Sequence, residues 1–335
     1  MIELAVFGAG RIGQVHALNA AAHPSARLKY IVDPVASEHR EHLAIQTGAV
    51  LCDPEEVFAD PDITGIVIAS STDTHAELLL RAAQAGKAVF CEKPVSLDFA
   101  TVVDVTSKVE NAGVACLLGF QRRYDPDYRL VRDRIASGQA GRLEHIVMHT
   151  RDPSPPPRFY VERSGGMFRD QAIHDFDMAR YLLGEEIAIV YAVGKSLIDP
   201  EIEAAGDIDT AMITLTSVSG RFVQMINCRR APFGYDQRLE ALCSSEVLYV
   251  ENRPQRGVMI ADANGFHSSI PMNYFIERFA GAYLAEMHAF IDMIEKGTKP
   301  LAGIRDGLEA QRLAEAAIVS MTTGSPVHIS SDWHP

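Results

Sequence analysis

Gly8-Ala9-Gly10-Arg11-Ile12-Gly13 lies between a short apolar run and a segment with helical spacing, near the start of the chain. In such a G-x-G-x-x-G motif the first glycine permits a tight turn, the second lets the backbone approach a pyrophosphate, and the third allows close helix–strand packing. The following helix N-terminus offers free N–H groups to the phosphates. Alone the motif is weak, since glycine turns also arise by chance, but a strand at 3–7 precedes it and a helix at 11–22 follows. We therefore predict a dinucleotide-binding loop.

Asp33 strengthens this prediction and selects the cofactor. It ends the next apolar run, Leu28–Val32, and lies twenty residues after Gly13. A carboxylate at this position hydrogen-bonds the adenosine ribose hydroxyls, and it repels the 2′-phosphate of NADP. No arginine or lysine follows directly, because the chain continues Pro34-Val35-Ala36. The sequence therefore predicts NAD and disfavours NADP.

The first 120 residues alternate strand-like and helix-like segments, which is typical of a parallel sheet with helices on both faces. Asp53-Pro54-Glu55-Glu56 is a helix start, with a capping residue, a proline at the first position and acids in the first turn. We predict an N-terminal Rossmann domain, residues 1–120, with a doubly wound parallel α/β sheet. Its strands are expected at 3–7, 28–32, 65–69, 88–91 and 116–119, and its other helices at 11–22, 75–85 and 99–111.

The pattern changes after residue 120. Helical and strand-like segments alternate less regularly, a proline cluster at 153–157 marks a loop, and strand follows strand from residue 187. We predict an α+β C-terminal domain, residues 121–335, with one large, mainly antiparallel sheet. Helices are expected at 127–137, 170–183, 282–296 and 304–323, and strands at 143–150, 187–196, 210–216, 221–228, 238–243, 247–251 and 257–261.

Composition excludes several classes of protein. The formal net charge of the 335 residues is −13, whereas a nucleic-acid-binding protein normally carries a basic excess. The five cysteines are scattered and form no C-x-x-C pair, which favours reduced thiols over disulfides or a zinc site. No run approaches the roughly 20 apolar residues of a membrane helix, and the chain start does not resemble a secretory signal. We expect a cytoplasmic protein without a metal and without nucleic-acid or membrane partners.

Lys93 follows a predicted buried strand, in the stretch Cys91-Glu92-Lys93-Pro94. Ligands of open α/β sheets bind beyond the carboxyl ends of the strands, and Pro94 disfavours helical backbone at Lys93. The ammonium group could donate to a substrate hydroxyl and lower the cost of removing its proton. A surface lysine before a turn fits this position equally well, so position alone leaves both interpretations open.

The predicted helix 170–183 carries one polar stripe, preceded by Gly165-Gly166, which would let a loop bring this helix to a ligand. A histidine flanked by carboxylates suits a general base, because the acid orients the imidazole and stabilises its charged form. Two other interpretations stay open, a structural histidine and a solvated helix face. A metal site has weak support, because no third ligand is evident. The stripe consists of Asp170, His174, Asp177 and Tyr181, with Ala172, Phe176, Ala179 and Leu183 on the core-facing side.

Together these motifs resemble a known family. The N-terminal GAGRIG, Glu92-Lys93-Pro94 and Asp170-x-x-x-His174 are similar, across essentially the whole chain, to the glucose–fructose oxidoreductase / inositol dehydrogenase / rhizopine-catabolism (Gfo/Idh/MocA) family. The glycine loop is generic, and the Asp-x-x-x-His segment with its flanks is the most specific part. Within the family the chain looks closest to inositol 2-dehydrogenases, in the stretches 119–126, 151–153, 165–170, 174–177 and 234–238.

The resemblance implies NAD-dependent oxidation of a polyol hydroxyl to a ketone, in the nearest case of myo-inositol to 2-keto-myo-inositol. His174 would take the hydroxyl proton, Asp170 would orient His174, and Lys93 would hold the hydroxyl. Arg123, Asp152, Asp177 and Tyr235 would complete the polyol site around these three. The cofactor would be held by Gly8, Gly10, Arg11, Ile12, Gly13 and Asp33, with Thr72, His75, Glu92 and Lys93 on the nicotinamide side.

The resemblance also implies a homotetramer that packs through the open face of the C-terminal sheet. Two departures affect the substrate: Gln121 stands where many inositol dehydrogenases carry Asn, and Tyr124 where many carry Phe. A scyllo-inositol or aldose dehydrogenase is therefore an alternative. A non-catalytic NAD(H)-binding sensor is a more remote one, disfavoured by the presence of Lys93 and His174. The sequence leaves the isomer, the reacting hydroxyl and the physiological direction open.

Overall fold

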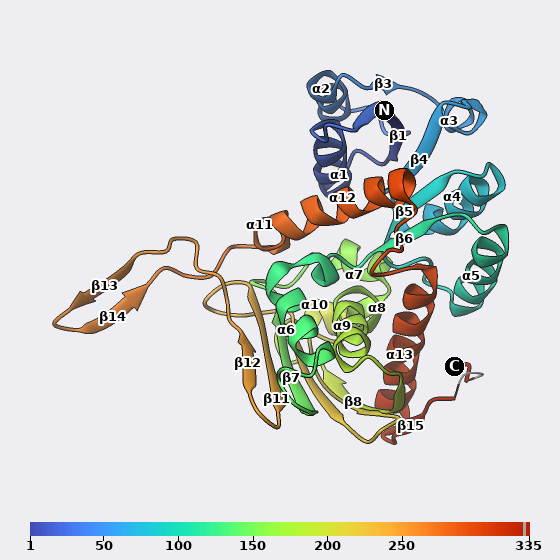
Figure 1. Cartoon of the computed structure of the whole chain (residues 1–335). Helices are drawn as coiled ribbons and strands as arrows, with labels where there is room; N and C mark the ends of the chain where they lie inside the picture. Colours follow the sequence, from blue (N-terminus) through green and yellow to red (C-terminus); the bar gives the residue numbers. More distant parts are fainter. Residues whose placement is uncertain (331–332) are drawn as a thin grey trace. The chain divides into compact units, whose positions relative to one another are not determined.

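The computed structural model describes residues 1–330 and 333–335, which form two compact units (Figure 1). The first unit comprises Met1–Asp125 and Gly281–Glu309, and the second comprises Pro126–Ala280 and Ala310–Pro335. The division at residue 120 did not anticipate the return of the chain to the first unit at Gly281. The assignment of cofactor and substrate to separate domains stays a prediction.

Six strands of the described chain form a parallel sheet in the first unit, in the order β3-β2-β1-β4-β5-β6. This confirms the predicted doubly wound sheet. The strand order reverses between β1 and β4, and sheets of this kind bind ligands in the crevice at the carboxyl ends there. The strands are β1 (Ile2–Phe7), β2 (Ala26–Val32), β3 (Val50–Leu51), β4 (Ile63–Ile68), β5 (Ala88–Glu92) and β6 (Cys116–Gly119).

Helices connect these strands, and most begin where the sequence predicts. Asp53 and Glu56 form a capping box at the start of α3, with Pro54 in the first turn. Helix α2 was not predicted, since its sequence shows little apolar periodicity; Ser37 caps it by accepting from the Arg40 amide. The helices are α1 (Arg11–Ala21), α2 (Glu38–Thr47), α3 (Pro54–Ala59), α4 (Thr72–Gln84) and α5 (Phe99–Ala112), followed by the 3-10 turn η1 (Gln121–Tyr124).

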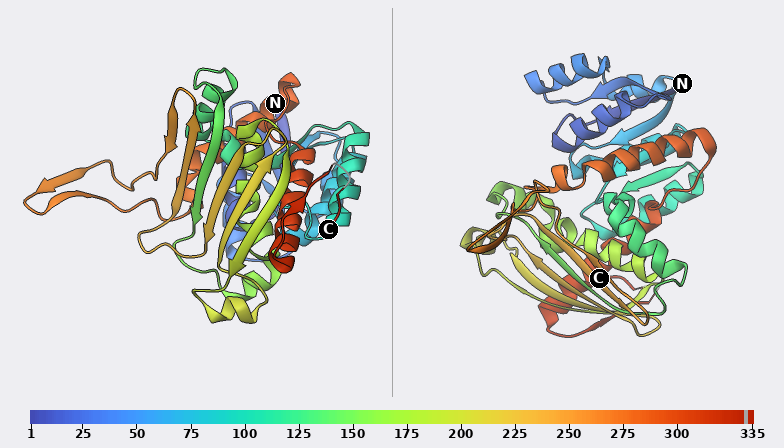
Figure 2. Two further views of the ribbon diagram at one scale, coloured as in Figure 1. Left: turned by 90° about the horizontal axis from the view of Figure 1, so that it is seen from below. Right: turned by 60° about the vertical axis from the view of Figure 1, so that its left-hand side comes forward.

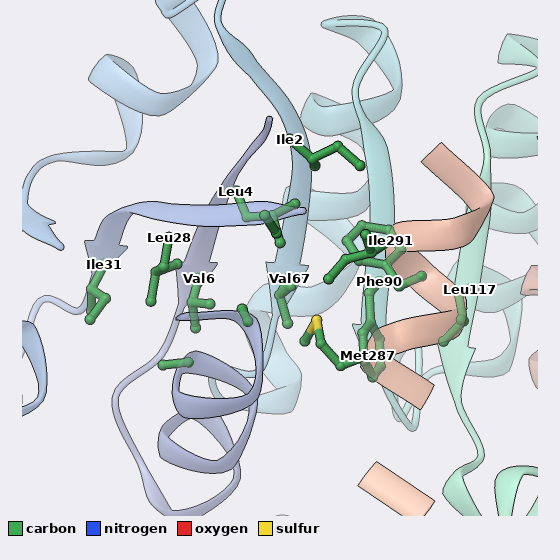
Figure 3. Packing of buried hydrophobic residues seen from close by; sticks show 14 of the residues in the cluster. Ile2, Leu4, Val6, Leu28, Ile31, Val67, Phe90, Leu117, Met287 and Ile291 are labelled. Atoms are coloured by element: carbon green, nitrogen blue, oxygen red, sulfur yellow. The ribbon is translucent and has the colours of Figure 1, made fainter. Parts of the chain in front are cut away.

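Helix α12 (Ala280–Lys296) completes the core of the first unit, although it comes from the far end of the chain. Met287, Phe290 and Ile291 are buried and have the spacing of one helix face. Figure 3 shows Met287 and Ile291 against side chains of the parallel strands. The partners of this helix in the cluster include Leu4, Val67, Phe90 and Leu117.

The second unit is built on a seven-stranded sheet, within the described residues, in the order β12-β11-β7-β10-β9-β8-β15. The β7–β10 pair is parallel and the other pairs are antiparallel. This confirms the predicted large, mainly antiparallel sheet. The strands are β7 (Leu143–Arg151), β8 (Ile187–Lys195), β9 (Thr210–Ser217), β10 (Phe222–Cys228), β11 (Asp236–Cys243), β12 (Val247–Val250) and β15 (Val327–His328).

Helices cover one face of this sheet, as Figures 1 and 2 show for α6 and α9. Alternate residues therefore differ in burial: Ala192 and Ile213 are buried, whereas Val193 and Met212 on the other face are exposed. The helices of this unit are α6 (Pro126–Ala136), α7 (Arg158–Ser164), α8 (Gly166–Asp170), α9 (Ile173–Leu183), α10 (Pro200–Ala204), α11 (Phe275–Arg278) and the larger part of α13 (Ile304–Thr323).

The predicted single helix at 170–183 is wrong, because α8 ends at Asp170 and α9 begins at Ile173. The amides of Gln171 and Ala172 both donate to the carbonyl oxygen of Met167, which closes α8. The Gln171 side chain then turns to the ends of two strands. Asp170 and His174 consequently lie on successive helices, and the polar stripe is not continuous.

The predicted strand at 257–261 does not join the large sheet. Strands β13 (Met259–Asp262) and β14 (Gly265–Ser268) form a separate two-stranded hairpin instead. The hairpin extends away from the seven-stranded sheet, as Figure 1 and the left view of Figure 2 show. Its local alternation is that of a strand, so the sequence could not tell which partner it pairs with.

Three exclusions from the sequence can be compared with the structure. All five cysteines are free thiols. In the described part of the chain, no helix is both long and apolar enough to span a bilayer. The same residues hold no group of three or more His, Cys, Asp or Glu side chains arranged for a metal ion.

Candidate functional site

The glycine loop has the geometry that a pyrophosphate requires. A Cβ atom at Gly8 would lie 2.5 Å from the Ala69 carbonyl oxygen, and one at Gly13 would lie 2.0 Å from the Gly8 carbonyl oxygen. Gly8 also has a φ of 100°, a conformation that side chains disfavour. A Cβ at Gly10 would meet no protein atom within 4 Å. Two glycines are thus required by the protein itself, while Gly10 leaves space in front of the helix.

The N-terminus of α1 is free to bind an anion. Gly10 occupies the capping position, so no side chain caps the helix, and the first turn contains no acidic residue. Helix N-termini of this kind combine unpaired N–H groups with the positive end of the helix dipole. The loop and helix therefore fit a dinucleotide phosphate.

Asp33 is held beside this loop. Its Oδ2 accepts from the Ala9 amide at 2.7 Å, and its Oδ1 accepts from the Val35 amide at 2.9 Å. The guanidinium of Arg40 donates to the Asp33 carbonyl oxygen at 2.8 Å. The carboxylate thus lies beside the glycine loop, directly after β2, and its contact with the ribose stays a prediction. The sequence did not single out Arg40, which comes from the unpredicted helix α2.

His75 joins the segments that follow β4 and β5. Its ring nitrogens lie 2.8 Å from the Pro94 carbonyl oxygen and 3.1 Å from the Ser70 carbonyl oxygen. Burial lowers the pKa of His75, which favours the neutral ring. Thr72 begins the same helix, α4. His75 is therefore buried, and it joins the segment before Thr72 to the segment after Lys93.

Glu92 makes a buried contact that the sequence did not indicate. Its Oε1 lies 2.8 Å from Nε2 of His16, a fully buried residue of α1. On its other side, a Cβ at Gly119 would lie 2.8 Å from Glu92 Oε2. The carboxylate is thus fixed between the glycine-loop helix and β6. The half-buried Lys93 follows directly, at the carboxyl end of β5.

Arg123, predicted to line the polyol site, is anchored within the first unit. Its guanidinium donates to Asp306 Oδ1 at 2.9 Å and to the Leu301 carbonyl oxygen. The neighbouring Tyr124 hydroxyl accepts from the Leu301 amide. These contacts give Arg123 a structural role, and its polyol contact stays a prediction.

In the second unit, the parallel strands β7 and β10 bring Asp152, a predicted site residue, next to Arg229, which the sequence did not single out. Arg151 is paired with Cys228, so the residues that follow, Asp152 and Arg229, are neighbours. Arg229 Nη1 lies 3.3 Å from Asp152 Oδ2, and its Nη2 donates to Asp170 Oδ2 at 3.0 Å. Arg229 is only 3% exposed. It therefore bridges two carboxylates that the sequence predicts in the site.

The end of α8 is bonded to both strand ends. Gln171 Nε2 donates to Asp152 Oδ2 at 2.6 Å and to the Cys228 carbonyl oxygen at 3.2 Å. The other oxygen of Asp170, Oδ1, accepts from the hydroxyl of Tyr160 on α7 at 2.9 Å. Neither Gln171 nor Tyr160 was singled out from the sequence.

His174 lies in the first turn of α9 and is half-buried. The next residue, Asp175, is buried and accepts from Thr150 Oγ1 at 2.8 Å and from Asn227 Nδ2 at 2.7 Å. These two bonds fix the start of α9 to β7 and β10. The position of His174 is thereby set relative to the cluster of Asp152, Asp170 and Arg229.

The interpretation of the stripe as a solvated face is wrong for Asp177, which is 1% exposed. Tyr235, directly before β11, is also buried, with its ring 5.7 Å from the ring of Tyr274. The core-facing side of the predicted helix is confirmed, since Ala172, Phe176, Ala179 and Leu183 are all buried.

Burial and charge act against each other in this cluster. Burial raises the pKa of Asp152; the Arg229 cation opposes that rise, and the Asp170 charge adds to it. Burial likewise raises the pKa of Asp207, a third acid near Arg229. Perturbed acids clustered with a buried cation are common at functional sites. Together these groups can hold hydroxyl groups and control a proton.

Both parts of the chain match models of known protein families. Residues 2–120 match a family model described as an oxidoreductase family with an NAD-binding Rossmann fold. Residues 128–248 match the GFO/IDH/MocA C-terminal domain.

Two named relatives are similar over nearly their whole length. An inositol 2-dehydrogenase of Rhizobium meliloti is 40% identical over 331 residues, covering 98% of this chain and 99% of the relative. A myo-inositol 2-dehydrogenase of Thermotoga maritima is 38% identical, with 96% of each chain covered.

Solved structures are similar as well. A myo-inositol dehydrogenase from Corynebacterium glutamicum has a TM-score of 0.94 at 39% identity, with 98% of this chain and 99% of that chain covered. A scyllo-inositol dehydrogenase from Lactobacillus casei, with bound NAD(H) and scyllo-inositol, has a TM-score of 0.89 at 27% identity, with 98% and 99% covered.

Proposed function

Because this chain belongs to the GFO/IDH/MocA family of NAD-dependent oxidoreductases, we propose that it oxidises a secondary hydroxyl of an inositol to a ketone. Myo-inositol, giving 2-keto-myo-inositol, is the first substrate to test. The observation that carries the proposal is the buried cluster of Asp152, Asp170 and Arg229 beside the helix that bears His174. It occurs in a chain 40% identical, end to end, to an inositol 2-dehydrogenase.

The residues of the first unit fit NAD. The glycine loop and the uncapped start of α1 would hold the pyrophosphate, together with Arg11 and Ile12, and Asp33 would hold the adenosine ribose. Thr72, His75, Glu92 and Lys93 would lie toward the nicotinamide. When bound, NAD supplies an acceptor for the hydride that leaves the carbinol carbon.

Three side chains would manage the proton. Oxidation of an alcohol to a ketone releases one hydride and one proton, so the enzyme must take the hydroxyl proton while the hydride leaves. We assign that step to His174, whose imidazole titrates near neutral pH. Asp170 would orient the ring and stabilise its charged form. Lys93 would donate to the same hydroxyl oxygen and lower the cost of removing its proton.

A polyol needs many hydrogen-bonding partners. Carboxylates accept from hydroxyl groups, and arginine and tyrosine donate to hydroxyl oxygens. We assign this role to Asp152, Asp177, Arg123 and Tyr235, together with the three proton-handling residues. The departures at Gln121 and Tyr124 keep scyllo-inositol and aldoses as alternative substrates.

The assembly and location belong to the same proposal. The open face of the seven-stranded sheet carries exposed apolar side chains, including Val193 and Met212. Such patches commonly mark contacts between subunits. We propose a cytoplasmic homotetramer that packs through this face.

The decisive experiment follows NADH formation spectrophotometrically, with NAD and a panel of inositol isomers and common aldoses. We expect the highest kcat/KM with an inositol. A higher value with an aldose would move the assignment to a sugar dehydrogenase. Binding of NADH without turnover of any polyol would indicate a sensor and overturn the proposal.

A further inference from the structure

Arg229 lies in the second unit at a position that none of the sequence motifs covers. It follows β10 directly, as Asp152 follows the parallel strand β7. Its guanidinium bridges Asp152 and Asp170. A buried arginine in this position either fills space or controls the two acids.

We propose that Arg229 is a positioning residue for the oxidation, which fixes the carboxylates of Asp170 and Asp152 in place and favours their ionised forms. The proposal rests on the proposed function, because it takes Asp170 as the acid that orients His174 and Asp152 as a polyol ligand. Arg229 itself acts through these two acids.

The geometry supports a role in orientation. The two oxygens of Asp170 are held by different groups: Oδ1 accepts from the Tyr160 hydroxyl at 2.9 Å and Oδ2 accepts from Arg229 at 3.0 Å. Two bonds to different oxygens fix the plane of the carboxylate. The planar fork of arginine suits this task, because one guanidinium can also reach Asp152.

The charges support a role in ionisation. The groups that face Arg229 are Asp152 after β7, Asp170 at the end of α8 and Asp207 before β9, with Tyr160 of α7 and Gln171 bonded to these acids. Burial acts to lower the pKa of Arg229, but Asp170, Asp152 and Asp207 together raise it, so it stays charged. One cation therefore interacts with three acids. Without it, these acids would bind protons more readily.

Protonation would impair the chemistry assigned to the site. A neutral Asp170 cannot stabilise the charged imidazole of His174, and a neutral Asp152 loses acceptor capacity for a hydroxyl. An opposite charge nearby typically lowers the pKa of an aspartate by about 1–3. Loss of Arg229 should therefore appear in the pH dependence of catalysis, which a residue that only fills space would not change.

The first test compares Arg229→Ala and Arg229→Lys with the parent enzyme, using NAD and the best inositol. We expect Arg229→Ala to lower kcat/KM about 10²-fold near neutral pH and to move the acid limb of its pH profile upward by about one pH unit. Arg229→Lys keeps a charge but lacks the fork, so its acid limb should stay near that of the parent while kcat remains reduced. Arg230→Ala, which removes an exposed arginine next in sequence, should match the parent. An unshifted acid limb in Arg229→Ala would overturn the proposal.

The second test needs no turnover, so it separates failure of this inference from failure of the proposed function. In Arg229→Ala, the pKa of Asp152 would rise further above its unfolded value, and the loss of the cation would raise the pKa of Asp170 as well. The folded variant then binds more protons than the unfolded chain at intermediate pH. Protonation of these acids therefore stabilises the folded variant at low pH, and this contribution is lost as pH rises through their folded-state pKa values. The deficit in Tm relative to the parent should be largest at about pH 8 and should shrink toward about pH 5. A deficit that is constant across this range means a packing role and contradicts the proposal.

Discussion

Asp33 contacts both the glycine loop and Arg40. Its carboxylate accepts from the Ala9 amide inside the glycine loop, so it stabilises that loop, and in the proposed function it also presents a charge to the ribose. Arg40 lies on the other side, bonded to the Asp33 carbonyl oxygen. We therefore expect cofactor preference to depend on the balance between the Asp33 anion and the nearby Arg40 cation.

We predict that Asp33→Ala reduces the preference for NAD over NADP by about 10²-fold, because a like-charge contact with the 2′-phosphate disappears. The Arg40 guanidinium, bonded to the backbone carbonyl oxygen of residue 33, would then no longer be opposed by the carboxylate, so the double variant Asp33→Ala/Arg40→Ala should bind NADP more weakly than the single one. Affinity for NAD should also fall, since the loop loses a bond. Isothermal titration calorimetry with both cofactors measures this, and an unchanged ratio of the two Kd values would refute the assignment.

His174 is the second residue whose role can be tested alone. We predict that His174→Ala loses about 10²–10⁴-fold in kcat, the usual contribution of a positioned acid or base. NADH should still bind, because the predicted cofactor contacts come from other residues. His42→Ala removes an exposed histidine and serves as the control. Near-parental oxidation of every accepted polyol by His174→Ala would show that another group takes the proton.

Sequence motifs predicted some of the candidate site residues and missed others. Lys93, Asp170 and His174 stand in short patterns that can be seen without a structure. Arg229 does not, because its importance comes from the parallel pairing of β7 with β10, strands separated by more than seventy residues. His16 is hidden for a similar reason, since its partner Glu92 lies seventy-six positions away. Contacts of this kind depend on strand order, which alternation along the chain does not reveal.

At the scale of elements, the three glycines of the loop have different tasks. Gly13 allows α1 to pack on the loop, because a Cβ there would collide with the Gly8 carbonyl oxygen. A Cβ at Gly10 would meet no protein atom within 4 Å, so a methyl group there could obstruct a bound ligand without disturbing the fold. Substitutions at the two positions should therefore separate folding from binding.

We predict that Gly10→Ala keeps the Tm of the parent within about 2 °C, while NADH affinity falls at least about tenfold, because the methyl group occupies the approach of the pyrophosphate. Gly13→Ala should instead lower Tm by several degrees, about 2–4 °C for each kcal/mol lost in a domain of this size. Differential scanning fluorimetry and NADH fluorescence titration give the two readouts. A Gly10→Ala protein that binds NADH normally would show that the phosphates lie elsewhere.

Periodicity predicted the elements better than their partners. Alternation of strands and helices gave the first sheet, and the change of pattern after residue 120 gave the second. The break between α8 and α9 was missed because Gln171 and Ala172 keep nearly helical backbone angles, so the spacing of apolar residues runs through it. The hairpin at 259–268 was missed because a strand pattern does not name its partner.

At the scale of the whole molecule, the chain is not divided into two consecutive pieces. Helix α12 returns to the first unit and buries Phe290 against Phe90, with ring centroids 5.8 Å apart. Its apolar spacing predicted a helix but not which sheet it covers. A fragment ending near residue 120 would expose the face of the first sheet that this helix covers.

We predict that Phe290→Ala destabilises the protein by about 3–5 kcal/mol, the usual cost of removing a buried aromatic side chain. The loss should weaken NADH binding at elevated temperature, because the glycine loop belongs to the same unit. Glu295→Ala, an exposed residue of the same helix, should leave stability unchanged. Urea denaturation followed by circular dichroism measures both variants, and equal stability of the two would contradict a core role for α12.

The open face of the seven-stranded sheet decides whether the proposed tetramer is right. Val193 pairs with Met212, and Met212 pairs with Ile226, so these side chains form one row across β8, β9 and β10. Val193 is 47% exposed and Met212 is 51% exposed, which is unfavourable for side chains that remain in water. In a symmetric contact, a glutamate placed in this row would face the apolar side chains of the partner subunit or the same glutamate of that subunit.

We therefore predict that Val193→Glu/Met212→Glu dissociates the assembly in size-exclusion chromatography with light scattering, whereas Val218→Glu, in the exposed turn after β9, does not. A double variant that keeps the parental mass would exclude this face as the subunit contact, because two buried, unpaired charges per protomer cost far more than an interface of ordinary strength tolerates.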